Sequence, residues 1–269
     1  QFYRNHNVTL ILDNLSVLLY GFIISYVSFV ALWIVQVKSN DAGWVDIGWT
    51  LGLGSLVIYL GITSEGLLTR RIIASLLIGI WAIRLASFII KDRLFKEEED
   101  SRYQNLRRYW GNKANFKFYF FFTFQSFLVI LFSIPFLPIF YNPNPLGIID
   151  LIGIILWFIA FIGEARADKQ LRDFKKLPEN KFKVCRVGFW ERSRHPNYFF
   201  EWLQWIAYVF LSIGSNEFYL SLIGPIFMYF FLIKVSGVYW VELQAIKKRG
   251  EVYKKYQQEV PMFFPKINR

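Results

Sequence analysis

The chain has 269 residues, of which 55% are hydrophobic, 20% are aromatic and 19% are charged. Average soluble domains carry about 25% charged residues, and the charges here fall in blocks between long apolar runs. This pattern excludes an ordinary soluble domain and predicts that most of the chain lies in lipid. The net charge of +11 is explained by basic blocks beside apolar runs, as in cytoplasmic loops of membrane proteins, so we expect no nucleic-acid partner.

The chain has one cysteine, Cys185, and two histidines, His6 and His195. An internal disulfide needs two cysteines, and a zinc site needs several nitrogen or sulfur ligands. We therefore expect neither a disulfide nor a metal site. We also expect no cleavable signal peptide, because the first apolar run is longer than the apolar core of such a peptide and lacks a basic segment before it.

Seven apolar runs are candidates for membrane-spanning helices, each of which needs about 20 mostly apolar residues. In chain order they are Leu15–Val37, Val45–Ile62, Ile72–Ile90, Phe116–Phe140, Leu146–Ile162, Tyr198–Ile213 and Phe218–Val241. Asp13 or Asn14 fits the N-cap of the first run, and Pro135 and Pro138 should kink or stop the fourth. The second, fifth and sixth runs are short, so tilted, broken or partly inserted helices are open alternatives there. We predict an all-α, polytopic bundle of about seven helices with cytoplasmic loops and a C-terminal tail.

Charge sets the expected orientation of this bundle. The segments Lys91–Lys117, Arg166–Arg194 and Val241–Arg269 together hold 25 of the 31 lysines and arginines. Seven helices place the three segments on one side of the membrane, and the positive-inside rule makes that side the cytoplasm. The opposite loops, around Asn142–Gly147 and Gly214–Glu217, contain no lysine or arginine. We therefore predict an integral, multi-pass protein with a cytoplasmic C-terminus, in which residues 1–269 form a single membrane-embedded domain.

Two ionisable side chains interrupt the second and third runs, where each is a candidate for function. Asp46 begins the second run, with Trp49 and Thr50 on its face at i+3 and i+4. A desolvated acid there could serve as a general acid, or it could be a first-turn carboxylate that suits the helix dipole. Arg84 keeps its proton, so it either pairs with a carboxylate such as Asp46 or positions a phosphate or acid.

A second group of charges follows the fifth run. Glu164 and Asp168 are four residues apart and share a helix face, which Arg172 and Lys175 continue. The carboxylates could hydrogen-bond a ribose and the cations could hold phosphates. A solvated, charged helix end would explain the same four residues, and both interpretations stay open at this point.

The densest polar cluster lies in Arg192–Trp202, where a basic loop joins the sixth run. Pro196 fits the first turn of a helix, whose free N–H groups and dipole favour anions. Several different polar side chains converge at that helix start, and we expect a ligand site there rather than a bland helix terminus. They are Arg194, His195, Asn197, Tyr198 and Glu201. No Rossmann or Walker motif is present in the sequence, so a nucleotide would have to be held by the bundle and its loops.

The segment from Glu164 to the C-terminus, with its Arg-His-Pro-Asn-Tyr block and the following Glu201, resembles the steroid 5-alpha reductase superfamily. Most of the chain from Asp46 to Pro265, and most strongly Arg186–Trp205, resembles the bacterial branch of that superfamily, which implies a bacterial inner membrane. The resemblance also implies that NADPH binds between the last helices and the cytoplasmic loops. The positions that match the superfamily's cofactor site are Glu164, Asp168, Arg186, Asn197 and Glu201.

On the substrate side, the resemblance makes Asp46 the nearest equivalent of the superfamily's substrate-facing acid. The superfamily's catalytic tyrosine aligns with Trp81, which has no phenolic proton to donate. Arg84 completes this expected catalytic group. The isoprenylcysteine carboxyl methyltransferases share an Arg-His-Pro-x-Tyr block, so the same resemblance also allows S-adenosylmethionine, held by Arg194, His195 and Tyr198.

These observations leave three hypotheses for function. The first is an NADPH-dependent reductase that acts on a C=C or C=O bond of a lipophilic, steroid-, sterol- or lipid-like substrate. Residues 15–141 would form the substrate cavity, entered from membrane lipid, and residues 146–269 the cofactor-binding module. The second is an S-adenosylmethionine-dependent membrane methyltransferase. The third is a non-enzymatic scaffold or lipid-binding protein whose basic loops contact anionic headgroups.

Overall fold

The computed structural model describes residues 6–91, 99–235 and 237–266. Within these ranges every regular element is a helix. Six helical segments of the described part are long and apolar enough to cross a membrane, which confirms the predicted polytopic α-helical bundle. They are Leu15–Ser39, Trp44–Thr63, Leu68–Ile89, Ser101–Phe140, Ile148–Lys176 and Phe218–Arg249. The sixth predicted run forms α9 (Pro196–Ser212), which has 17 residues and is shorter than the usual span.

The chain divides into two compact units. The N-terminal unit comprises Gln1–Pro145 and Ser212–Ser221, and the C-terminal unit comprises Leu146–Leu211 and Leu222–Arg269. The candidate acid Asp46 and the arginine Arg84 therefore belong to the first unit. The predicted cofactor residues belong to the second.

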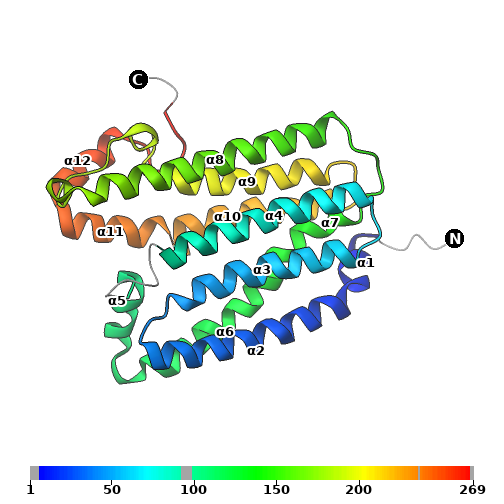
Figure 1. Ribbon diagram of the computed structural model, residues 1–269, viewed down its shortest axis with the longest axis horizontal. Helices are drawn as coiled ribbons and strands as arrows, with labels where there is room; N and C mark the ends of the chain where they lie inside the picture. Colours follow the sequence, from blue (N-terminus) through cyan, green and yellow to red (C-terminus); the bar gives the residue numbers. More distant parts are fainter. Residues whose placement is uncertain (1–5, 92–98, 236, 267–269) are drawn as a thin grey trace. The chain divides into compact units, whose positions relative to one another are not determined.

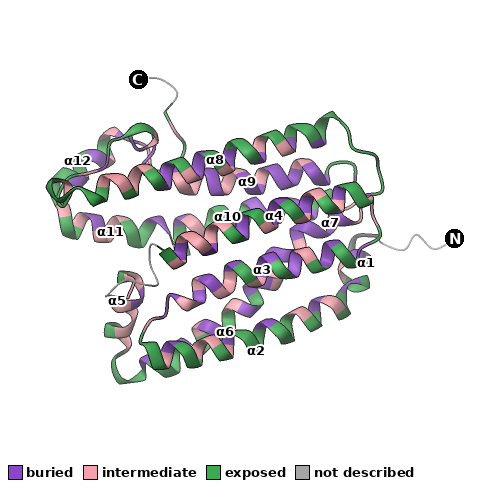
Figure 2. Ribbon diagram, in the orientation of Figure 1, coloured by how far each residue is buried: buried purple, intermediate pink, exposed green. Residues whose placement is uncertain are grey.

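The N-terminal unit is built on four long helices, α2, α3, α4 and α6, which span Leu15–Ser39, Trp44–Thr63, Leu68–Ile89 and Ala114–Ser133. Helix α3 packs against the other three, and α2 also packs against α6 (Figure 1). Large aliphatic and aromatic side chains remain exposed along these helices (Figure 2). Such continuous apolar surface is unusual on a soluble protein and is expected where helices face lipid.

Short helices complete the N-terminal unit: α1 (His6–Asp13), α5 (Ser101–Trp110) and α7 (Leu137–Phe140). As predicted, the prolines end the fourth run, because α6 stops at Ser133 and is followed by a 3-10 turn, Ile134–Phe136, and then by α7. Asn14 occupies the N-cap position of α2, but its side chain makes no capping hydrogen bond. Its amide instead donates to the Leu10 carbonyl.

The C-terminal unit contains α8, α9, α10, α11 and α12, which span Ile148–Lys176, Pro196–Ser212, Ile223–Phe230, Val238–Arg249 and Glu251–Glu259. Glycines let α8 and α9 approach closely, since a Cβ at Gly163 would lie 2.5–2.6 Å from the Phe200 ring. The buried Trp157 indole donates to the Tyr208 hydroxyl at 3.0 Å. Helix α9 begins at Pro196, as the sequence predicts.

The last apolar run is not one regular helix. A 3-10 turn, Phe218–Leu222, precedes α10, and the π-helical turn Phe231–Val235 follows it before α11 begins. A Cβ at Gly237 would collide with the Leu232 carbonyl, so this bend depends on a residue without a side chain. The bend precedes the part of α11 that carries Glu242.

Candidate functional site

Glu242 on α11 is the centre of the polar cluster at the start of α9. Its Oε1 accepts a hydrogen bond from Nε of Arg194 at 2.6 Å and contacts Nε2 of His195 at 3.1 Å. Its Oε2 accepts from the Gln257 amide at 2.7 Å. The Tyr198 ring stacks on the His195 ring, with centroids 5.6 Å apart. Arg194 and His195 of the Arg-His-Pro-Asn-Tyr block thus share one carboxylate.

Arg194 also fixes the chain that follows α12. Its Nη1 donates to the carbonyls of Gln257 and Val260 at 2.9 and 2.6 Å, and its own backbone N–H donates to the Pro261 carbonyl. The Ser193 hydroxyl donates to the Phe263 carbonyl at 2.8 Å. Arg194 is only 9% exposed, so this cation is enclosed by partners from two helices and the C-terminal segment.

Burial determines the protonation of two groups near this cluster. Burial lowers the pKa of His195 below its ordinary value, while the contact with Glu242 acts in the opposite direction. Burial also raises the pKa of the Tyr256 phenol, so its hydroxyl stays protonated and donates to the Trp190 carbonyl at 2.5 Å. Tyr256 is therefore a neutral donor in the packing of α12 against the 188–195 segment.

A buried polar layer joins α8 to α9. The Asn197 amide donates to Oδ1 of Asp168 at 3.1 Å, and the Gln204 amide donates to Oε2 of Glu164 at 2.7 Å. Glu201, on the same helix, accepts from the Trp205 indole at 3.1 Å. All three acids are nearly enclosed by protein. The structure thus brings Asp168 together with Asn197, as the sequence analysis groups them, and it pairs Glu164 with Gln204.

A hollow of about 680 Å³ lies beside this cluster in the C-terminal unit. It is lined by Gln170, Arg186, Gly188, Phe189, Glu191, Arg192, Glu259, Val260 and Lys266. Gly188 has a positive φ of +59°, and a Cβ there would collide with the Gln170 side chain. The side-chain Oε1 of Gln170 accepts a hydrogen bond from the Phe189 backbone N–H at 3.1 Å. This bond holds the Gly188–Phe189 side of the hollow against α8.

Three cations line the hollow: Arg186, Arg192 and Lys266. Arg186 forms an ion pair with Glu259 at 2.5 Å and lies over the Tyr256 ring. Lys266 is tied to the segment by its backbone N–H, which donates to the Arg192 carbonyl at 2.9 Å. The side chains of all three cations are exposed, so they are accessible to an anion in the hollow.

The other predicted cofactor residues take different positions. Arg172 and Lys175 lie on exposed faces of the last turns of α8. Of the predicted set, Arg186 lines the hollow, whereas Arg194 and His195 hold its neighbouring segment through Glu242. The predicted cofactor residues are therefore divided among an internal polar cluster, the exposed last turns of α8 and one position in the hollow, all within one unit.

In the N-terminal unit, Asp46 lies in the first turn of α3 and receives two side chains from α5. Its Oδ1 accepts from the Tyr103 hydroxyl at 2.7 Å, and its Oδ2 accepts from Nη2 of Arg102 at 2.8 Å. Arg102 also contacts Asp100. Neither partner was expected from the sequence, because residues 101–110 are too polar to be recognised as part of a span.

Trp81 and Arg84 lie on α4. Trp81 is buried, and its ring meets the Trp49 ring edge-on at 6.0 Å. The Arg84 guanidinium lies over the Phe88 ring, 5.9 Å from its centroid. An ion pair between Arg84 and Asp46 stays a prediction. The packing of Trp81 gives this side chain a structural role whether or not it also faces a substrate.

Comparison with known proteins identifies the family. A family model described as a protein of unknown function, DUF1295, matches residues 32–260. The chain belongs to the DUF1295 family. An uncharacterized protein of Schizosaccharomyces pombe is 24% identical over 279 residues, which cover 92% of this chain and 79% of that protein. No solved structure matches the chain.

The DUF1295 match contains every predicted site residue, from Asp46 to Glu201, and it also contains Glu242. Lys266 lies beyond it. Glu242 was not among the predicted site residues, although it is the only acid between Phe218 and Arg249. Since an arginine near lipid requires an anionic partner, that lone acid was the available signal. No comparable signal marked Gln204 or Lys266.

Proposed function

We propose that this DUF1295 protein is an NADPH-dependent reductase of a lipophilic substrate, with the cofactor held in its C-terminal unit. The observation that carries the proposal is the hollow of about 680 Å³ lined by Arg186, Arg192 and Lys266. Guanidinium and ammonium groups are strong partners for phosphates. The volume lies within the range of about 300–1,000 Å³ that small-molecule sites occupy.

The remaining lining residues also suit a dinucleotide. Phe189 offers an aromatic face for a flat ring, and the carboxylates of Glu191 and Glu259 can accept hydrogen bonds from ribose hydroxyls. Three cations and two carboxylates leave the wall with an excess of positive charge. That excess favours a cofactor with three phosphates over S-adenosylmethionine, which has no phosphate and carries a positive sulfonium.

The Arg-His-Pro-Asn-Tyr block has a positioning role in this proposal. Arg194 donates to the carbonyls of Gln257 and Val260, on either side of Glu259. The Asn197–Asp168 bond holds the start of α9 against α8. These buried contacts keep the wall of the hollow in one arrangement, which lowers the entropic cost of binding a cofactor.

NADPH, when bound, supplies a hydride from its nicotinamide to the substrate. The chain's own contribution on the substrate side is assigned to the N-terminal unit, whose exposed apolar helices allow entry from lipid. Asp46 is the proposed acid that polarises the acceptor. Both of its oxygens accept hydrogen bonds, from Tyr103 and Arg102, so the Tyr103 hydroxyl is a proton donor in direct contact with this acid. We assign the protein to a bacterial inner membrane, with its C-terminus in the cytoplasm.

Isothermal titration of the purified, full-length protein in detergent tests the proposal. NADPH should bind, and Arg192→Gln should weaken it about tenfold, because a hydrogen bond to a charged group is worth about 1.5–3 kcal/mol. Lys254→Gln is the matched control, since Lys254 is exposed and pairs with the exposed Glu251. This control should bind NADPH as the wild type does.

The same titration contains the outcomes that would contradict the proposal. Binding of S-adenosylmethionine without binding of NADPH would identify a methyltransferase. Binding of neither compound would favour a scaffold or lipid-binding protein. Asn197→Ala and Glu201→Gln sharpen the distinction, because a scaffold that tolerates both changes keeps its function, whereas the reductase loses affinity for NADPH.

A further inference from the structure

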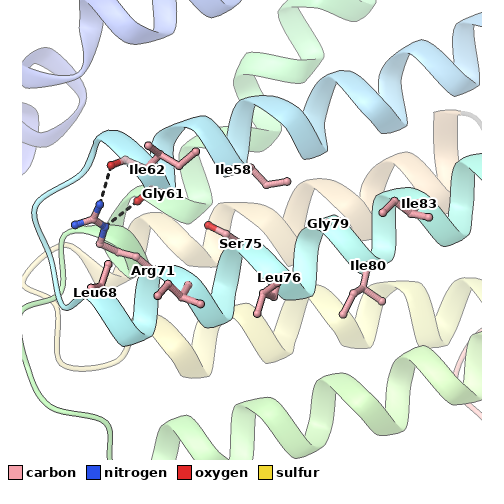
Figure 3. Close-up of a pocket in the computed structure, with 11 residues that line it drawn as sticks. Ile58, Gly61, Ile62, Leu68, Arg71, Ser75, Leu76, Gly79, Ile80 and Ile83 are labelled. Carbon is pink, nitrogen blue, oxygen red and sulfur yellow. Dashed lines mark hydrogen bonds between the residues drawn. The ribbon is translucent and has the colours of Figure 1, made fainter.

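An apolar groove of about 480 Å³ runs along α3 and α4 in the N-terminal unit (Figure 3). It is lined by Ile58, Gly61, Ile62, Leu68, Arg71, Ile72, Ser75, Leu76, Gly79, Ile80 and Ile83. Leu76 is 58% exposed and Ile83 is 67% exposed. The groove therefore opens outward from the helix pair, on a surface that would contact the acyl region of a membrane.

Small residues form the floor of this groove. A Cβ at Gly61 would collide with the Ser75 hydroxyl, and a Cβ at Gly79 would touch the Ile58 side chain at 3.4 Å. Because these positions carry little or no side chain, α3 and α4 pack closely and leave a furrow between larger aliphatic residues. The furrow is a consequence of helix packing and requires no movement to form.

Arg71 is the one charged residue among those that line the groove, and it lies near one end (Figure 3). Its Nε donates to the Gly61 carbonyl at 2.8 Å and its Nη2 donates to the Ile62 carbonyl at 2.7 Å. These bonds fix the guanidinium at the C-terminal end of α3. Arginine has five N–H donors, so its outer edge can still donate to an anion.

The dimensions match one chain of a lipid. Arg71 and Ile83 are twelve residues apart on α4, which corresponds to about 18 Å of helix. Half of the hydrocarbon core of a bilayer is about 15 Å thick. A phosphate held at Arg71 would therefore leave its acyl chain along the groove for the depth of one leaflet.

We propose that this groove binds one anionic phospholipid, with an acyl chain between α3 and α4 and the headgroup phosphate on Arg71. The apolar walls provide the contact with the chain, and the fixed cation provides the charge complementarity. This site does not depend on the reductase proposal, because it lies in the N-terminal unit and needs none of the cofactor residues.

Native mass spectrometry of the full-length protein in detergent tests this site. The probes are dioleoyl phosphatidylglycerol, dioleoyl phosphatidylcholine and oleic acid, each added at the same concentration. One phosphatidylglycerol should be retained, with about tenfold lower retention of phosphatidylcholine, because the choline cation offsets the phosphate charge and is repelled by the fixed guanidinium. Arg71→Gln should remove this preference. Arg108→Gln, a matched loss of an exposed cation on α5, should preserve it.

A second variant keeps the test valid if Arg71→Gln fails to fold. Leu76→Trp fills the groove without changing its charge, and it should abolish retention of phosphatidylglycerol. Ile155→Trp is the matched control, because Ile155 is also half exposed, on α8. Equal retention of the two phospholipids, retention of oleic acid alone, or a Leu76-dependent dimer in place of bound lipid would each overturn the proposal.

Discussion

Glu242 contacts four polar side chains, from Arg194, His195, Tyr253 and Gln257. Removing its charge would leave the enclosed Arg194 guanidinium without an anionic partner, and breaking such a pair costs about 3 kcal/mol. We therefore expect Glu242→Gln to lower the free energy of unfolding by about that amount. Thermal unfolding in detergent, followed by tryptophan fluorescence, measures the change. Glu251→Gln is the control, since Glu251 is highly exposed, and an equal loss in both variants would contradict this account.

His195 makes the stability of the C-terminal unit dependent on pH. Burial lowers the pKa of His195 in the folded state, so the unfolded chain takes up this proton at higher pH than the folded chain does. The free energy of unfolding therefore includes the full contribution of neutral His195 above about pH 6.5. It decreases as pH falls below that value. Unfolding temperatures should fall more steeply between about pH 6.5 and 5 in the wild type than in His195→Gln. Identical pH profiles would refute the assignment.

At the scale of elements, the contact between α8 and α9 depends on glycine. A Cβ at Gly163 would lie 2.5–2.6 Å from the ring of the buried Phe200. Gly163→Leu should therefore separate the helices and lower the free energy of unfolding by about 1–3 kcal/mol, as overpacking does elsewhere. Ile159→Leu, at an exposed position of the same helix, should leave stability unchanged. Comparable unfolding temperatures for the two variants would show that the helices adapt without cost.

The long helices were predictable because hydrophobic length is the constraint that a bilayer imposes. The stop at Pro135 was predictable for an equally local reason, the missing N–H of proline. Helix α5 was missed, because Ser101–Trp110 is polar and is held by ion pairs with distant residues such as Asp46. The bend between α10 and α11 was missed as well, since apolar composition continues through it.

The candidate site was predictable in composition but not in arrangement. The sequence placed Arg194, His195 and Asn197 at a helix start, and the structure confirms that helix start. Which acid each of them meets depends on the packing of helices, so spacing along the chain does not reveal that Glu242 is the partner of Arg194 and His195. The three cations of the hollow come from separate segments, and spacing along the chain cannot reveal that they share one wall.

At the scale of the whole molecule, the basic segments predict the orientation in the membrane. Two single-cysteine variants in a Cys185→Ala background test this orientation. Lys254→Cys lies at an exposed position of α12, and Pro145→Cys lies in the exposed loop before α8. A membrane-impermeant maleimide should label Pro145→Cys in spheroplasts, or in cells whose outer membrane has been permeabilised while the inner membrane stays intact. It should label Lys254→Cys only after lysis, because the positive-inside rule keeps basic segments in the cytoplasm. The reverse pattern would invert the proposed topology.

The central claim is that the wall formed by Arg186, Arg192 and Lys266 holds the phosphates of NADPH. A structure of the full-length protein determined after incubation with NADPH tests it most directly. The account predicts density for the phosphates between these three cations, in the hollow that Phe189 and Glu259 also line. Dinucleotide density elsewhere in the molecule, with this hollow empty, would contradict it.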